Sequence, residues 1–132
     1  MNLNDITREA NSLADENYPT TAIKGYVNSS IARINATLNA RLPMFTNTTT
    51  DYTALSDDWV NLLFIPYAAY GIKTNDGSLN EADRFRNEFE INFRLLEENR
   101  FKAIPEVYRG THFGGIYQID TTAGLNVGWF KK

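Results

Sequence analysis

An apolar run occupies the middle of this 132-residue sequence, where residues 59–72 read WVNLLFIPYAAYGI. As a helix this segment is apolar on nearly every face, and such a helix lies at the centre of a protein with other helices around it. The run is shorter than the ~20 residues of a membrane span. It contains Pro66, which has no backbone N–H to donate, so we expect a kink or a turn there. Ser56 or Asp57 is expected to cap the start of the helix, with Asp58 in its first turn.

Three further segments have the spacing of amphipathic helices, in which apolar residues recur every three or four positions. The clearest is residues 19–41, which Pro19 opens. Its recurring apolar side chains are Ile23, Val27, Ile31, Ile34, Leu38 and Leu42. This narrow seam predicts packing against another helix. The residues expected to face outward are Asn28, Arg33, Asn35 and Arg41.

The other two helices are expected at residues 3–16 and at residues 79–99. The apolar stripe of the first is Leu3, Ile6, Ala10 and Leu13. The stripe of the second is Ala82, Phe85, Phe89, Phe93 and Leu96. A capping box of Ser78 and Glu81 is expected to begin the second, after a turn at residues 75–77. The i,i+4 ion pairs expected on its exposed side are Arg84–Glu88, Arg86–Glu90, Glu90–Arg94 and Arg94–Glu98.

A threonine-rich stretch, PMFTNTTTDYTAL at residues 43–55, precedes the central apolar helix. Its composition indicates a loop that is too polar to belong to the core. The whole pattern predicts a mainly α fold in a single domain, with residues 1–109 forming a four-helix bundle-like body.

The pattern changes at residues 110–132, GTHFGGIYQIDTTAGLNVGWFKK, which hold five of the eight glycines. Apolar and polar residues alternate in IYQIDTT and in LNVGWF, and a period of two indicates strands. We therefore expect an extended C-terminal arm or a β-hairpin. Because an isolated two-stranded hairpin is only marginally stable in water, this arm needs a partner. That partner is either the protein's own body or another chain.

Two bulky aromatics, Trp129 and Phe130, stand near the end of the arm, next to a glycine and two lysines. Tryptophan is a preferred energetic centre of protein interfaces, so both residues are interpreted as anchors. Docking on the protein's own body and docking on a partner remain equally open. The residues expected at a protein interface are Arg109, Tyr117, Ile119, Leu125, Val127, Trp129 and Phe130.

Residue types that usually carry catalysis or bind metals are scarce. The chain has no cysteine and one histidine, His112, which lies between glycines with no acid nearby. Neither a zinc site nor a hydrolase triad is therefore expected. Asp57 and Asp58 are neighbours on a helix and do not face each other, so they are not a catalytic carboxylate pair. The sequence predicts a protein that is not an enzyme and uses no metal or cofactor.

Charge is unevenly distributed along the chain. Residues 100–132 hold five lysines and arginines against two acids, a charge of +3, and residues 1–99 hold eight against fourteen, a charge of −6. An acidic body lacks the concentrated basic face of a nucleic-acid-binding protein. The basic C-terminal part suits docking on an acidic neighbour, including another copy of the chain.

The succession of these segments resembles the head-to-tail connector proteins of tailed bacteriophages, which are small adaptor or head-completion proteins beneath the portal. Much of the likeness lies in residues 52–99, in the helix start LSDDW, the aromatic stretch YAAYG and the helix segment EADRFRNEF. The resemblance implies a structural virion protein of the phage neck that is made in the host cytoplasm. It implies a ring, usually of twelve copies, that assembles on the portal after DNA packaging.

Such a ring extends the DNA channel and offers a platform for the next neck or tail protein. DNA passes through the lumen without specific binding, which an acidic wall favours because like charges repel. No membrane partner is implied. The resemblance also implies that the arm, residues 110–132, reaches the portal or a neighbouring subunit.

Two alternatives remain open at this point. One is a small cytoplasmic assembly chaperone or regulator that binds one protein client, with its arm folded on its own body until the client arrives. The other is a hydrolase that uses His112.

Overall fold

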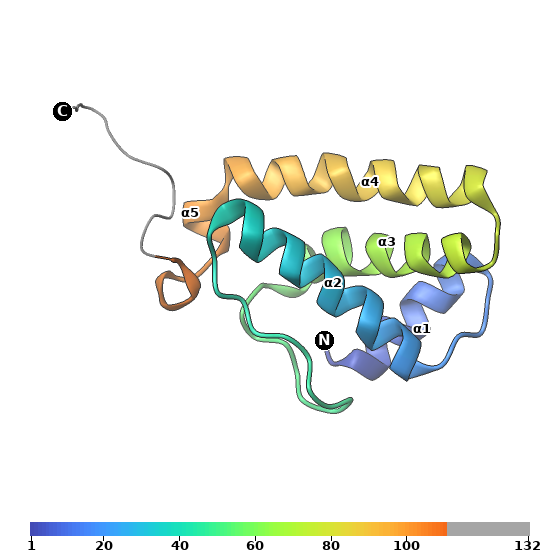
Figure 1. Ribbon diagram of the computed structural model, residues 1–132. Coiled ribbons are helices and arrows are strands. Elements are labelled where there is room, and N and C mark those ends of the chain that lie inside the picture. The colour runs from blue at the N-terminus through green and yellow to red at the C-terminus, as the bar shows by residue number, and fades with distance from the viewer. Residues whose placement is uncertain (111–132) are drawn as a thin grey trace.

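Figure 1 shows the computed structural model of the chain, which describes residues 1–110. This part is mainly helical, as predicted, and within it the only strand-like pairing is an isolated antiparallel bridge between Ala40 and Arg109. The elements are α1 Leu3–Ala14, α2 Thr20–Leu38, α3 Asp57–Asn75, α4 Leu79–Glu98, α5 Arg100–Ala103 and the 3₁₀ helix η1 Glu106–Tyr108. None of these described helices is both long and apolar enough to cross a membrane.

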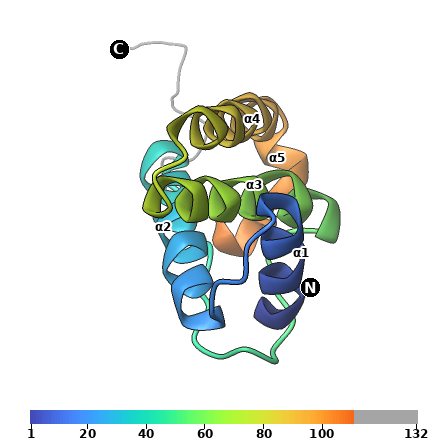
Figure 2. The same cartoon turned by 90° about the vertical axis from the view of Figure 1, so that its right-hand side faces the viewer.

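Helix α3 is the central helix of the body, as its apolar run predicted. It packs against α4 on one side and against α1 and α2 on the other (Figure 2). Its side chains are buried on several faces at once, for example Val60, Phe64 and Ala69. Leu62 is an exception, since it is 38% exposed. A helix surrounded in this way organises the positions of all the others.

Helix α3 continues without interruption through Pro66, so the turn considered there is wrong. A proline at this position leaves the carbonyl of Leu62, four residues earlier, without its helical N–H donor. The side chain of Asn92 on α4 supplies that donor, since its Nδ2 atom donates to the Leu62 carbonyl oxygen over 2.8 Å. Asn92 is only 8% exposed. A buried amide therefore replaces a backbone hydrogen bond inside the α3–α4 interface.

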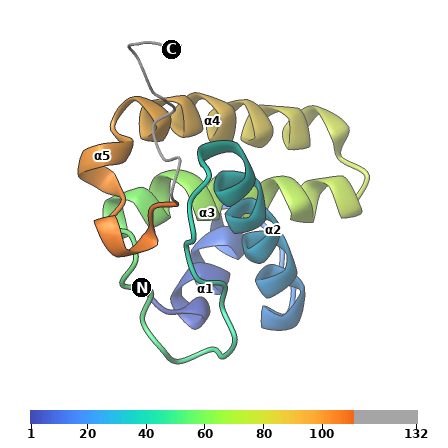
Figure 3. The same cartoon turned by 60° about the vertical axis from the view of Figure 1, so that its left-hand side comes forward.

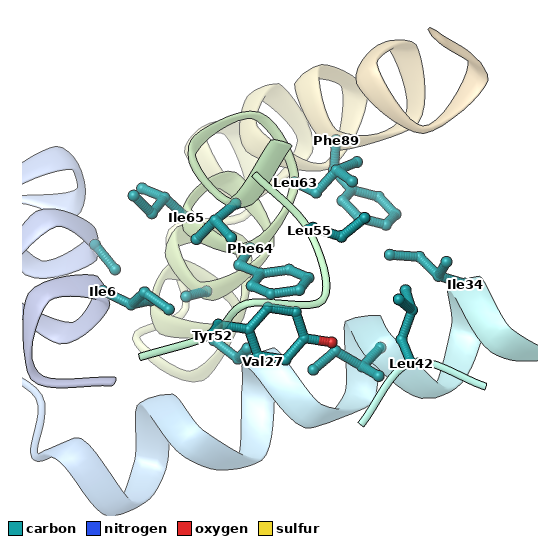
Figure 4. Packing of buried hydrophobic residues seen from close by; sticks show 14 of the residues in the cluster. Ile6, Val27, Ile34, Leu42, Tyr52, Leu55, Leu63, Phe64, Ile65 and Phe89 are labelled. Atoms are coloured by element: carbon teal, nitrogen blue, oxygen red, sulfur yellow. The ribbon is translucent and has the colours of Figure 1, made fainter. Parts of the chain in front are cut away.

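Residues 43–55 form a loop, as predicted, but the expectation that this loop is too polar to belong to the core is wrong. Phe45 and Tyr52 stack with their ring centroids 4.9 Å apart, and both meet Phe64 edge-on. Figure 4 shows Tyr52 beside Phe64 in this cluster. The buried residues of the connection between α2 and α3 are Ala40, Leu42, Phe45, Tyr52, Ala54 and Leu55. Four of the threonines lie at the exposed tip, residues 46–51. They make the stretch polar on average, although apolar residues on either side of the tip are buried.

Two asparagines of α2 hold this connection against the helix. Asn35 accepts a hydrogen bond from the N–H of Leu42 over 2.9 Å and donates to the Leu42 carbonyl over 3.0 Å. Asn28 makes the same pair of bonds with Phe45, over 2.8 and 3.1 Å. The expectation that Asn28 and Asn35 face outward is therefore wrong. An asparagine amide carries one donor and one acceptor side by side, so it satisfies both backbone groups of an extended residue.

A third asparagine, Asn11 of α1, forms the same pair of bonds with Tyr18, both over 2.9 Å. These bonds close the connection between α1 and α2, in which Asp15 has a left-handed φ of 55°. The hydroxyl of Tyr18 in turn accepts a hydrogen bond from Asn75 at the end of α3 over 3.1 Å. Tyr18 is thus hydrogen-bonded to α1 through its backbone and to α3 through its hydroxyl.

Helix α1 begins with a capping box that the sequence analysis missed. The Asn2 side chain accepts from the N–H of Asp5 over 2.9 Å, and the Asp5 carboxylate accepts from the N–H of Asn2 over 3.3 Å. The buried stripe of α1 ends at Ala14 and not at Leu13, which is 44% exposed. A step of four residues from Ala10 stays on the buried face, whereas a step of three leaves it.

The apolar stripe predicted for α4 is confirmed, but the predicted capping box is wrong. Ser78 is the N-cap residue and forms no side-chain cap hydrogen bond. Glu81 instead pairs with Lys73 of α3 over 3.3 Å, and Glu16 pairs with the same ammonium group over 3.5 Å. A buried ammonium group needs carboxylate partners, and this need decides where Glu81 points. Desolvation alone lowers the pKa of Lys73, but the two glutamates outweigh it and the pKa is raised.

None of the four i,i+4 ion pairs expected on α4 forms in the part of the chain that the structure describes. Glu90 pairs with Arg33 of α2, and Arg86 pairs with Asp83 one turn before it. The pair with Arg33 joins α2 to α4 across α3. For Glu90, a contact between helices has therefore replaced the expected contacts with Arg86 and Arg94 along α4.

Replacing Asn92 by leucine, which has a similar shape, removes the donor and leaves the Leu62 carbonyl unpaired. We expect the free energy of unfolding, measured by urea denaturation, to fall by roughly 1–3 kcal/mol. Adding Pro66→Ala restores an N–H for that carbonyl, so the double variant should recover most of the loss. An N92L penalty that is the same with proline and with alanine at position 66 would contradict the role of the Asn92 side chain.

Candidate assembly site

Residues 100–110 bring the chain from the end of α4 to the C-terminal end of α2 (Figure 3). The N–H of Arg41 donates to the Tyr108 carbonyl over 2.6 Å, next to the bridge between Ala40 and Arg109. Ile104 is fully buried and anchors this segment in the core. The segment that leads to the predicted arm is therefore fastened to the body.

Arg109, one of the expected interface residues, forms several bonds within its own chain. Its Nε donates to the Ile104 carbonyl over 2.9 Å, and its guanidinium also donates to the Phe101 carbonyl. The carbonyl of Arg109 accepts from the Arg41 guanidinium over 3.0 Å. Arg109 thus positions the backbone at the point where the body ends.

Gly110 passes very close to the end of α2. A Cβ atom at this position would lie 2.0 Å from the carbonyl oxygen of Asn39, far inside van der Waals contact. Asn39 ends α2 in the left-handed region with a φ of 53°, which turns that carbonyl toward the passing chain. At this point glycine is required for the close approach of two backbones.

Aromatic, aliphatic and basic side chains surround this point, and we call Arg41, Arg100, Phe101, Val107 and Arg109 the exit patch. Arg100 and Arg109 are half-buried, and the other three are exposed. The guanidinium carbons of Arg100 and Arg109 lie 5.0 and 5.5 Å from the centroid of the Phe101 ring. Phe101 is 54% exposed and Val107 is 73% exposed. Arginine and large aromatic residues are enriched at the energetic centres of protein interfaces. The exit patch therefore has the composition of a contact surface and a positive charge.

A second candidate surface is a groove of about 280 Å³ between α2 and α3, which we call the tyrosine groove. Its lining residues are Tyr26, Ser29, Tyr67, Tyr70, Gly71, Thr74 and Asn75. The groove depends on Gly71, because a Cβ there would lie 2.5 Å from the ring of Tyr26. Ring faces with hydroxyl and amide groups around them suit an occupant that has a large apolar body and a polar edge.

Contacts beneath the tyrosine groove hold its floor in place. Tyr67 meets Tyr70 and Phe89 edge-on, with ring centroids 5.5 and 4.8 Å apart. The guanidinium of Arg33 lies over Phe89 at 5.5 Å and forms a two-bond pair with Glu90, one bond of 2.8 Å. Burial raises the pKa of Tyr67. The rings are pre-positioned because neighbours on two helices fix them.

Most of the residues expected at an interface lie outside the described residues. These are Tyr117, Ile119, Leu125, Val127, Trp129 and Phe130, and His112 lies there too. Asp57 and Asp58 lie in the first turn of α3, where Asp57 accepts from the N-terminal ammonium group of Met1 over 2.7 Å. Across residues 1–110 no group of three or more histidine, cysteine, aspartate or glutamate side chains is arranged to hold a metal ion.

The sequence analysis did not find the tyrosine groove. It placed the whole apolar run of residues 59–72 at the centre of the protein, but Tyr67 and Tyr70 are only half-buried. A chemical signal was present, since tyrosine tends to keep its hydroxyl near water or a polar partner. The small residues Gly71 and Thr74 nearby are a second signal, because they leave room beside the rings.

No protein-family model, curated protein or solved structure matches this chain.

Gly110→Ala forces a methyl group against the Asn39 carbonyl, so the segment before it must move. We expect the Arg41 amide, which donates to Tyr108, to lose protection in hydrogen exchange, and the free energy of unfolding to fall by roughly 1–3 kcal/mol. Gly25→Ala is the matched control, because no atom lies within 4 Å of the added methyl. In the interior of α2 that change should raise the free energy of unfolding by roughly 0.5–1 kcal/mol. Unchanged protection of Arg41 in G110A would contradict the close approach.

Proposed function

We propose that this chain is a structural protein of a tailed-bacteriophage neck. It forms a ring, of twelve copies in this proposal, under the portal. The ring extends the DNA channel and gives the next neck or tail protein a platform. In this proposal residues 110–132 are an extended assembly arm that follows a four-helix body, and the chain works by binding and not by catalysis.

The observation that carries the proposal is the way residues 108–110 are held against the C-terminal end of α2. The bond between Arg41 and Tyr108 and the close approach of Gly110 to Asn39 fix the point from which the next 22 residues begin. That point lies in the exit patch, among three arginines and the exposed ring of Phe101. A strand-like sequence that starts from a fixed point on the surface suits strand addition or groove docking on another chain.

The distribution of charge supports contact between copies. The exit patch is positive, whereas residues 1–99 carry a net charge of −6. A ring is built from heterologous contacts, in which two different surfaces of the same chain meet. Opposite charges on those surfaces orient the copies and speed their encounter. The acidic body also suits a channel wall along which DNA slides, because it does not bind phosphates.

The proposal is tested by mixing the purified protein with portal rings of the phage that encodes it and imaging the product by electron microscopy. We expect portal rings decorated by a second ring. A full-length variant with Trp129→Ala and Phe130→Ala should decorate at least about 30-fold more weakly, because each anchor of an interface contributes ~2 kcal/mol or more. Its free energy of unfolding should stay unchanged.

Leu79→Ala serves as the matched control for that variant. Leu79 is a large and exposed apolar residue in the first turn of α4, in the body and not in the arm. We expect it to decorate portal rings like the unchanged protein. Portal rings that stay bare with the unchanged protein at micromolar concentration would contradict the proposed function.

A further inference from the structure

We propose that the tyrosine groove of one copy receives Trp129 and Phe130 from the arm of a neighbouring copy. This inference deepens the proposed function and rests on it, because it assumes that copies assemble beside one another. It assigns a receiving site on the body to the two residues that the sequence marks as anchors.

The size and chemistry of the groove favour side chains as its occupant. Its volume of about 280 Å³ lies just below the range of about 300–1,000 Å³ that is typical of sites for small molecules and cofactors. Tyr26, Tyr67 and Tyr70 offer ring faces and edges, against which aromatic rings pack at centroid distances of ~4.5–7 Å. Polar groups at the edge of the groove can accept a hydrogen bond from the indole N–H of Trp129. They belong to Ser29, Thr74 and Asn75.

Charge next to the groove fits the two lysines that follow the anchors. Residues 74–83 begin with two residues of the groove lining and contain three acids, of which Glu81 pairs with Lys73, Asp83 pairs with Arg86, and Asp76 is exposed. Lys73 precedes them, but Glu16 and Glu81 pair with it. Lys131 and Lys132 come directly after Phe130. Asp76 directly follows Asn75 of the groove lining, so in this proposal the ammonium groups lie near that carboxylate when the two rings enter the groove.

The length of the arm favours a neighbouring copy over the same chain. From Asn39, beside the start of the arm, to Tyr26 the path along α2 is about 20 Å, which six extended residues cover. Eighteen residues lie between Gly110 and Trp129, and a fully extended chain of this length reaches up to about 60 Å. The excess of about 40 Å exceeds the roughly 30 Å diameter of a body of this size. An arm of this length spans an adjacent body, whereas docking on its own body would leave most of it unused.

The inference is tested by disulfide cross-linking of full-length protein, which has no native cysteine to interfere. Copies with Ser29→Cys in the groove are mixed with copies with Lys131→Cys in the arm, alone and on portal rings, and then oxidised. We expect a cross-linked product of two chains. Ser12→Cys is the matched control, because Ser12 is an exposed serine of α1 outside the groove, and it should give at least tenfold less product. A doubly substituted S29C/K131C protein shows whether the disulfide forms within one chain.

A blocking variant gives an independent readout. Ser29→Arg places a long cationic side chain at the groove, where it fills space and repels the lysines of the arm. We expect assembly on portal rings to weaken at least tenfold, whereas Ser12→Arg should assemble like the unchanged protein. Both serines are exposed, so both variants should keep the urea unfolding midpoint of the unchanged protein.

The outcomes separate this inference from the proposed function. Rings that assemble equally well with S29R, or that cross-link no better through S29C than through S12C, overturn the inference and leave the proposed function standing. A disulfide that forms only within one chain of S29C/K131C also overturns it, because the arm then docks on its own body. If no copies assemble under any condition, both proposals fall.

Discussion

The hydrogen bond from Asn92 to the Leu62 carbonyl allows a proline to stand inside the helix that α1, α2 and α4 all pack against. Without it, an unpaired carbonyl would lie in the α3–α4 interface at a cost of ~1–3 kcal/mol. The bond also sets how α4 lies along α3, since the amide reaches that oxygen in one register. The register in turn places Phe89 under the tyrosine groove and Glu90 within reach of Arg33.

In the connections between helices, side-chain amides and one isolated bridge supply the backbone hydrogen bonds that a neighbouring strand would supply in a sheet. The connections between helices are extended, and their backbone groups need partners because they run against a buried core. Asn11, Asn28 and Asn35 each pair with both groups of one residue, and the bridge between Ala40 and Arg109 adds one strand-like contact. The result is a helical body whose connections are fixed and whose exit patch has a defined position.

The helices were predictable because their evidence is periodic. The stripe of α4 and the central place of α3 follow directly from apolar spacing. The errors lie where a single partner outside the same helix decides which way a side chain points. Glu81 caps nothing because Lys73 is buried beside it, and Asn28 faces inward because Phe45 needs a backbone partner. The tyrosine groove was missed for a related reason, since spacing does not distinguish a ring that fills the core from one that lines a surface.

The reliance on asparagine has a consequence for how the protein ages chemically. Deamidation turns an asparagine into an aspartate, which keeps its acceptor oxygens but has no donor at neutral pH. At Asn28 this change would leave the carbonyl of Phe45 unpaired and bring a negative charge close to it. The helices would lose nothing of their own, because none of their backbone bonds involves that amide. Slow damage of this kind would therefore loosen the connection between α2 and α3 first and leave the helical body intact.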